Sequence, residues 1–187
     1  MAKRPGNVRV IDRDRGYKAI MAEVKKLNNS YTSVGVHKGV RRSDSSIDMA
    51  QLAHIHEFGI NINVTDRMRG FLHYIGIHLK PSTGQIRIPS RPFMRSWADG
   101  NRVKLGNFAK GLYLKVLSNA ITAERALGLL GEFGVSGLQK NFTAGEFQPL
   151  HPATIANREN GGTRPLVDTG QLRNSITHVE YMGRKPE

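Results

Sequence analysis

Residues 122–138 read TAERALGLLGEFGVSGL, and this stretch limits the possible folds more than any other part of the chain. Its apolar residues recur at helical spacing and Thr122 can cap the helix; they are Leu127, Leu130, Val135 and Leu138. Glycine occupies every third position from 128 to 137, and each glycine costs a helix about 1 kcal/mol relative to alanine. Such a pattern indicates either the close approach of another helix, which is the commoner reason, or a mobile segment.

The other elements follow from periodicity on either side of this helix. Apolar stripes predict helices over residues 14–27, 46–58, 68–75, 105–121 and 152–158, with Gly59 at a left-handed cap and a break at residues 99–101. Alternation predicts strands over residues 33–37, 85–88 and 176–181. Asp168 and Gln171 have the spacing of a capping box for one more short helix. We therefore expect an α+β fold with a small, mainly antiparallel sheet packed with several helices.

Length and composition set the class of protein. The chain has 187 residues, no cysteine and 39% hydrophobic residues, which is typical of a folded protein. The lack of cysteine excludes disulfides, cysteine nucleophiles and thiolate metal sites. No apolar run approaches a membrane span and no secretion signal is evident, so we expect a protein kept in a reducing cytosol or in something assembled there. We expect a basic N-terminal arm over residues 1–13 and a single domain over residues 14–187.

Positive charge is concentrated in two blocks. The chain carries 28 basic and 15 acidic side chains, a formal net charge of +13, with a sequence pI of about 10.4. Residues 1–42 have a net charge of +8 and residues 67–104 of +7, whereas residues 43–66 have −4. A basic surface attracts phosphate backbones or acidic proteins, although any single Lys or Arg could equally well belong to an ordinary solvated face.

No histidine pair predicts a metal site. His54 and His56 are the only closely spaced histidines, and residues two apart on a helix point about 200° away from each other, so one ion cannot bind both. We therefore expect ordinary surface or core histidines and no cofactor.

Residues 166–170, Leu-Val-Asp-Thr-Gly, resemble the active-site loop of aspartic proteases, in which two such aspartates face each other. A homodimer could supply the second aspartate. The residues that follow, Gln171-Leu172-Arg173, predict a helix start rather than that loop, and no β-barrel pattern surrounds them. We expect Asp168 or Thr169 to cap a helix that begins near Gly170. The sequence also has no phosphate-binding loop and no nucleophile elbow, so we expect no enzymatic activity.

Four segments, in this order, resemble the virion-morphogenesis or tail-completion proteins of long-tailed bacteriophages. They are residues 52–59 (LAHIHEFG), 88–95 (IPSRPFMR), 150–158 (LHPATIANR) and 166–176 (LVDTGQLRNSI), and residues 68–72 (MRGFL) also fit the Mu-like branch. The second segment departs from the usual family pattern, because Ser90 stands where alanine is usual. The resemblance covers about two thirds of the chain. The first 45 residues resemble the family only weakly.

The resemblance implies a non-enzymatic virion protein that forms a ring, most simply a hexamer, at the head-proximal end of the tail or in the neck. Such a protein helps to join the tail to the capsid and is assembled in the host cytoplasm. Its implied partners are copies of itself and other neck, tail-tube or connector proteins, with non-specific contact to packaged DNA and none to a membrane. The alternative that we retain is a basic accessory protein that binds nucleic acid through the two basic blocks.

The implied site is an interface. We expect neighbouring subunits to contact Arg91, Arg95, Glu57, Arg41, Arg42, Lys3, Arg4 and Arg9. We expect structural roles within the motifs for Phe58, Gly59, Pro89, Pro92, Phe93, Asp168, Thr169, Gly170, Leu172 and Ser175. Pro89 and Pro92 fix the backbone around Arg91, which lowers the entropic cost of presenting that side chain to a neighbour. The basic arm is too polar to form a core, so we expect it to order only on contact.

Overall fold

Two short antiparallel sheets and seven helices make up the described part of the chain, residues 14–39, 47–158 and 161–183 of a computed structural model. The expected α+β class is confirmed. The helices are α1 (Tyr17–Asn28), α2 (Met49–Phe58), α3 (Asp66–Tyr74), α4 (Phe93–Leu117), α5 (Ala123–Ala144), α6 (Pro152–Ala156) and α7 (Gln171–Asn174). The strands are β1 (Tyr31–Val36), β2 (Ile60–Asn63), β3 (Gln85–Ile88) and β4 (Ile176–Tyr181).

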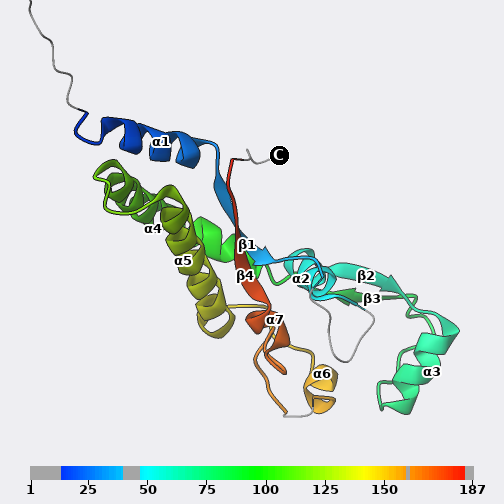
Figure 1. The fold of residues 1–187 in the computed structure, drawn as a ribbon. Coiled ribbons are helices and arrows are strands. Elements are labelled where there is room, and N and C mark those ends of the chain that lie inside the picture. The colour runs from blue at the N-terminus through cyan, green and yellow to red at the C-terminus, as the bar shows by residue number, and fades with distance from the viewer. Residues whose placement is uncertain (1–13, 40–46, 159–160, 184–187) are drawn as a thin grey trace, which may run out of the picture.

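The glycine-rich helix α5 is the centre of the fold. It packs against α4 on one side and against β1 and β4, an antiparallel pair, on another (Figure 1). The glycines permit this: a Cβ at Gly131 would lie 2.5 Å from the His178 ring, and one at Gly134 would lie 3.0 Å from Val34. The close approach of neighbouring elements therefore explains the glycines, as expected. The partner is mostly the β1–β4 pair rather than a helix, although Gly137 meets Trp97 of α4.

Two clusters of buried residues hold these elements together. The larger cluster includes Phe93, Phe142, Leu172 and Ile176, which come from α4, α5, α7 and β4. The smaller one joins α4 and α5 near their connecting turn, with Leu27 of α1 packed against it. At that end Glu23 of α1 accepts a hydrogen bond from the Ala123 N–H at the start of α5.

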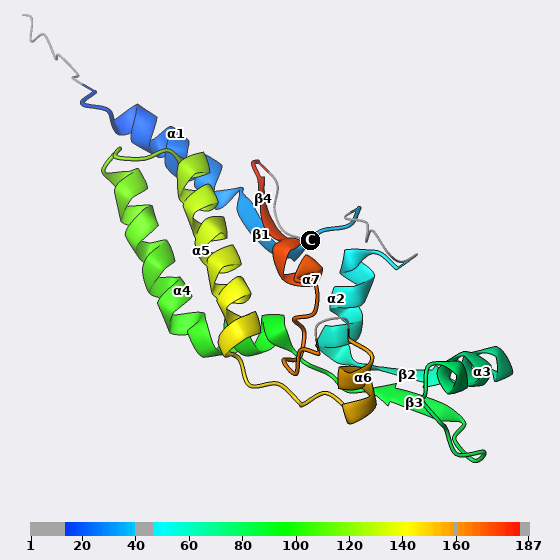
Figure 2. The same ribbon diagram turned by 90° about the horizontal axis from the view of Figure 1, so that it is seen from below.

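The second sheet forms a projection. Strands β2 and β3 pair antiparallel from Ile60↔Ile88 to Asn63↔Gln85, and α3 lies between them in the sequence. In Figures 1 and 2, α3 and α1 lie at opposite ends of the molecule. Tyr74 of α3 is 87% exposed and Phe71 is 61% exposed. The projection thus presents aromatic surface that the described residues do not cover.

Several expected boundaries are wrong. No break interrupts α4 at residues 99–101, because α4 packs along α5 and the helix runs through them; the Asn101 side chain donates to the Trp97 carbonyl. The helix also ends at Leu117 rather than at residue 121. Helix α2 begins after Asp48, whose side chain forms a capping box with Gln51. The polar stretch after Gly59 was not expected to pair, yet it contains β2, which β3 pairs with.

Candidate interface

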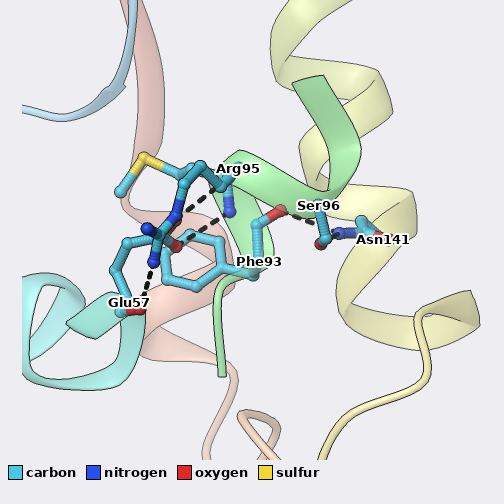
Figure 3. A network of polar contacts seen from close by, with 6 residues as sticks. Glu57, Phe93, Arg95, Ser96 and Asn141 are labelled. Carbon is cyan, nitrogen blue, oxygen red and sulfur yellow. Dashed lines mark hydrogen bonds and ion pairs between the residues drawn. The ribbon is translucent and has the colours of Figure 1, made fainter. Parts of the chain in front are cut away.

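Glu57 is a buried carboxylate that caps a helix other than its own. It lies in the last turn of α2 and is 4% exposed. Its carboxylate oxygens accept hydrogen bonds from the backbone N–H groups of Met94 and Arg95, each 3.0 Å long (Figure 3). These N–H groups belong to the first turn of α4, where a negative charge also suits the helix dipole.

Arg95 completes this contact. Its Nε lies 3.4 Å from Glu57 Oε1, and its Nη2 donates to the Glu57 carbonyl oxygen at 3.2 Å. Its guanidinium also lies over the Phe58 ring, 5.0 Å from the ring centroid. On the other side of α4, Asn141 of α5 donates to the Phe93 carbonyl (Figure 3). Glu57 and Arg95 therefore bind each other within the chain, and the Arg95 side chain is still 57% exposed.

Arg91 is also buried, at 5% exposure. Its Nε and Nη2 donate to the carbonyl oxygens of Gln148 and Pro149, at 2.9 and 3.2 Å. Its backbone N–H donates to the His56 carbonyl, which ties the segment to α2. Burial lowers the pKa of Arg91, and the nearby charge of Arg158 lowers it further. Contact of Arg91 with a neighbouring subunit stays a prediction; the side chain lines the cavity described below rather than the outer surface.

Arg158 organises the next motif. Its Nη1 donates to the carbonyl oxygens of Gly162, Arg164 and Val167 at 2.8–3.0 Å. Its Nε lies 3.9 Å from Asp168 Oδ1. We did not expect a site role for Arg158, although it is the last residue of the third motif. The available signal was its position directly before a glycine-rich loop, where many carbonyls lack regular partners.

Asp168 does not cap α7. The residue before that helix is Gly170, with φ of 80° and no side-chain cap bond, so the expected capping by Asp168 or Thr169 is wrong. The burial of Leu172 in the larger core cluster anchors the helix instead, and Ser175 Oγ closes its C-terminal turn by donating to the Leu172 carbonyl at 2.7 Å. Thr169 is exposed.

The remaining motif residues hold the corner between α2 and α4. Gly59 has φ of 74° and ψ of 171°, which is not the left-handed helical cap that we expected. A Cβ there would lie 2.8 Å from the Ile88 carbonyl, so the close approach of β3 requires glycine. Phe93 is fully buried against Phe142, with Pro92 before it at the start of α4. Pro89 lines the cavity described next. Phe58 does not belong to the core, because its side chain is 57% exposed.

A cavity of about 1020 Å³ lies where the motifs meet. Apolar side chains form much of its wall, among them Leu52, Leu72, Ile86 and Leu172. Arg91 and Arg158 also line it. Leu166, another lining residue, is held at φ of 63°, a strained conformation for a leucine.

The other expected interface residues, Arg41, Arg42, Lys3, Arg4 and Arg9, lie outside the described residues. Within the described ranges, no group of three His, Asp or Glu residues is placed to hold a metal ion. None of the helices in that part of the chain has the length and apolar character needed to span a membrane. Comparisons of the chain with models of known protein families, with curated proteins and with solved structures found no match.

Proposed function

We propose that this protein is a non-enzymatic structural subunit of a tailed-phage virion. In this proposal it forms a hexameric ring at the head-proximal end of the tail or in the neck and helps to join the tail to the capsid. The four segments that resemble tail-completion proteins are the starting point.

The observation that carries the proposal is that these four segments meet in space. Residues 52–59, 88–95, 150–158 and 166–176 all contribute to the wall of the cavity, although more than 100 residues separate the first from the last. Two of them are joined directly by Glu57 and Arg95. A chance likeness of short segments gives no reason for such clustering, whereas a shared fold does.

Exposed apolar side chains support the proposal that this protein is a subunit of a larger assembly. On the side of α4 away from α5, Val103 is 77% exposed and Leu114 is 55% exposed. A helix with apolar residues on both sides is typically buried on both sides. Together with Tyr74 on the projection, these residues favour contact with other subunits.

Deletion of the gene that encodes this protein tests the proposal. Negative-stain electron microscopy should then show filled heads and free tails that do not join, and expression of the chain in trans should restore complete particles. Particles that assemble normally without it would contradict the proposal.

The alternative, a nucleic-acid-binding accessory protein, is favoured by the exposed cations of α1 and α4. Those that belong to the two basic blocks are Lys18, Lys25, Lys26, Arg102 and Lys104. The two functions differ in affinity for duplex DNA. The virion subunit should bind DNA weakly, without sequence preference and with a steep loss as salt rises, whereas the accessory protein should bind tightly at moderate salt.

A further inference from the structure

The cavity between the motifs holds two arginines that are almost entirely removed from solvent. Arg91 is 5% exposed and the side chain of Arg158 is 10% exposed. Both line the cavity together with the apolar wall residues Leu52, Leu72 and Leu172. Buried cations in proteins are usually paired with a negative charge. The number of carboxylates in the cavity wall therefore indicates what kind of ligand the cavity would bind.

Negative charge in the cavity wall is scarce. Asp168 is the only carboxylate among the described lining residues, and it is half-exposed and 3.9 Å from Arg158 Nε. Three arginines line the same space: Arg87, Arg91 and Arg158. The backbone carbonyls that Arg91 and Arg158 bind satisfy hydrogen bonds but carry no net charge, and they leave Arg91 Nη1 and Arg158 Nη2 without a bond to the described residues.

We propose that this cavity binds an acidic peptide segment of another protein, with a carboxylate held by Arg91 and Arg158 and an aliphatic side chain packed against Leu52 and Leu72. Charge-assisted bonds from arginine to carboxylate are the strong class of hydrogen bond, and a low-dielectric wall strengthens them. The volume of about 1020 Å³ is at the upper limit of the roughly 300–1,000 Å³ of small-molecule pockets, which favours a peptide over a lone carboxylate. This proposal goes beyond the proposed function and holds or fails independently of ring formation.

The test is fluorescence anisotropy with the full-length protein and a labelled pentapeptide of alternating leucine and glutamate. Control peptides replace glutamate by glutamine or by lysine. We expect the glutamate peptide to bind at least about tenfold more tightly than either control, about 1.4 kcal/mol, and to weaken as salt rises. Equal binding of the three peptides, no binding at all, or equally tight binding of free glutamate would overturn the proposal.

Two adjacent residues of α3 provide a matched pair of variants. Leu72 lines the cavity, whereas Phe71 does not line it and is 61% exposed. Leu72→Glu places a carboxylate in the wall and should reduce peptide affinity at least about tenfold, whereas Phe71→Glu, with the same change of charge, should leave affinity within about twofold. Unchanged binding by Leu72→Glu would overturn the proposal.

Thermal melts establish that both variants are folded. If Leu72→Glu does not fold, Thr154→Glu takes its place, because Thr154 is exposed on α6 and also lines the cavity. A folded Thr154→Glu protein should bind the glutamate peptide several-fold more weakly than the wild type. Wild-type affinity in that variant would overturn the proposal.

Discussion

Arg91 ties the chain after α5 to the corner before α4. Its guanidinium binds two carbonyl oxygens that lie 57 and 58 residues further along the chain. Arg91→Ala should lower the free energy of unfolding by about 2–3 kcal/mol, because it leaves those carbonyls without a partner in a partly buried place. Chemical denaturation measures the loss.

Arg87→Ala is the matched control, because Arg87 is exposed on β3. It should change the free energy of unfolding by less than about 0.5 kcal/mol. An Arg91→Ala protein as stable as the Arg87→Ala protein would contradict the structural role of Arg91.

We expect Glu23, at the other end of the molecule, to make the stability of the protein depend on pH. Its carboxylate accepts a hydrogen bond from Lys26 Nζ at 2.6 Å and another from the Ala123 N–H at 2.8 Å. These two bonds, the first being the larger cause, hold the pKa of Glu23 below its ordinary value of 4.5. A lowered pKa means that the stabilisation is complete above the unfolded-state value and is lost as pH falls through the folded-state value.

The pH dependence is measured by comparison with Glu23→Gln. Thermal melts from pH 7 to pH 3 should show the wild type more stable at neutral pH, with the difference shrinking once the pH drops below the ordinary glutamate range. A difference that is constant over this range would contradict the role of the Glu23 carboxylate.

The residue-level roles of the site were only partly predictable. Glu57 and Arg95 were identified from the motifs, but their pairing was not. The position of Glu57 was an available signal. A carboxylate in the last turn of a helix interacts unfavourably with the dipole of that helix, which predicts a partner outside it. For Arg91 the motif identified the residue but not its partners, since these are backbone carbonyls 57 and 58 residues further along the chain and no residue type marks them.

At the scale of elements, the glycines of α5 position the helix on the β1–β4 pair. Gly131→Ala should lower the free energy of unfolding by about 1–3 kcal/mol, because its Cβ would lie 2.5–2.9 Å from the side chain of His178. Gly106→Ala in α4 is the control, because nothing lies within 4 Å of its Cβ. The control should gain about 0.5–1 kcal/mol from helix propensity alone. Denaturation curves that change in the same direction for both variants would contradict the close-approach account.

Element prediction succeeded where a buried stripe or an alternating pattern existed. Strands β3 and β4 match the predicted ranges, and Thr122 caps α5 as expected. It failed where long-range contacts outweigh local preference. Residues 99–101 favour a break locally, but the packing of α4 along α5 keeps the helix intact through them. Asp168 has the local spacing of a cap, yet it lies beside Arg158, from another segment.

For the whole molecule, the outward side of α4 is the surface that we expect subunits to share. The double variant Val103→Glu/Leu114→Glu should remain a stable monomer, because both side chains are already more than half exposed, but it should not form rings. Ser136→Glu, at an exposed position of α5, should form rings as the wild type does. Size-exclusion chromatography with light scattering separates the outcomes. Rings in the double variant would exclude this side of α4 from the interface.

Native mass spectrometry of the full-length protein tests the central claim, assembly into a ring, most directly. The proposal predicts a dominant species of six chains, each of 20.8 kDa, with little of the intermediate species that an open, growing chain would give. A spectrum that contains only the monomer at every concentration would contradict it.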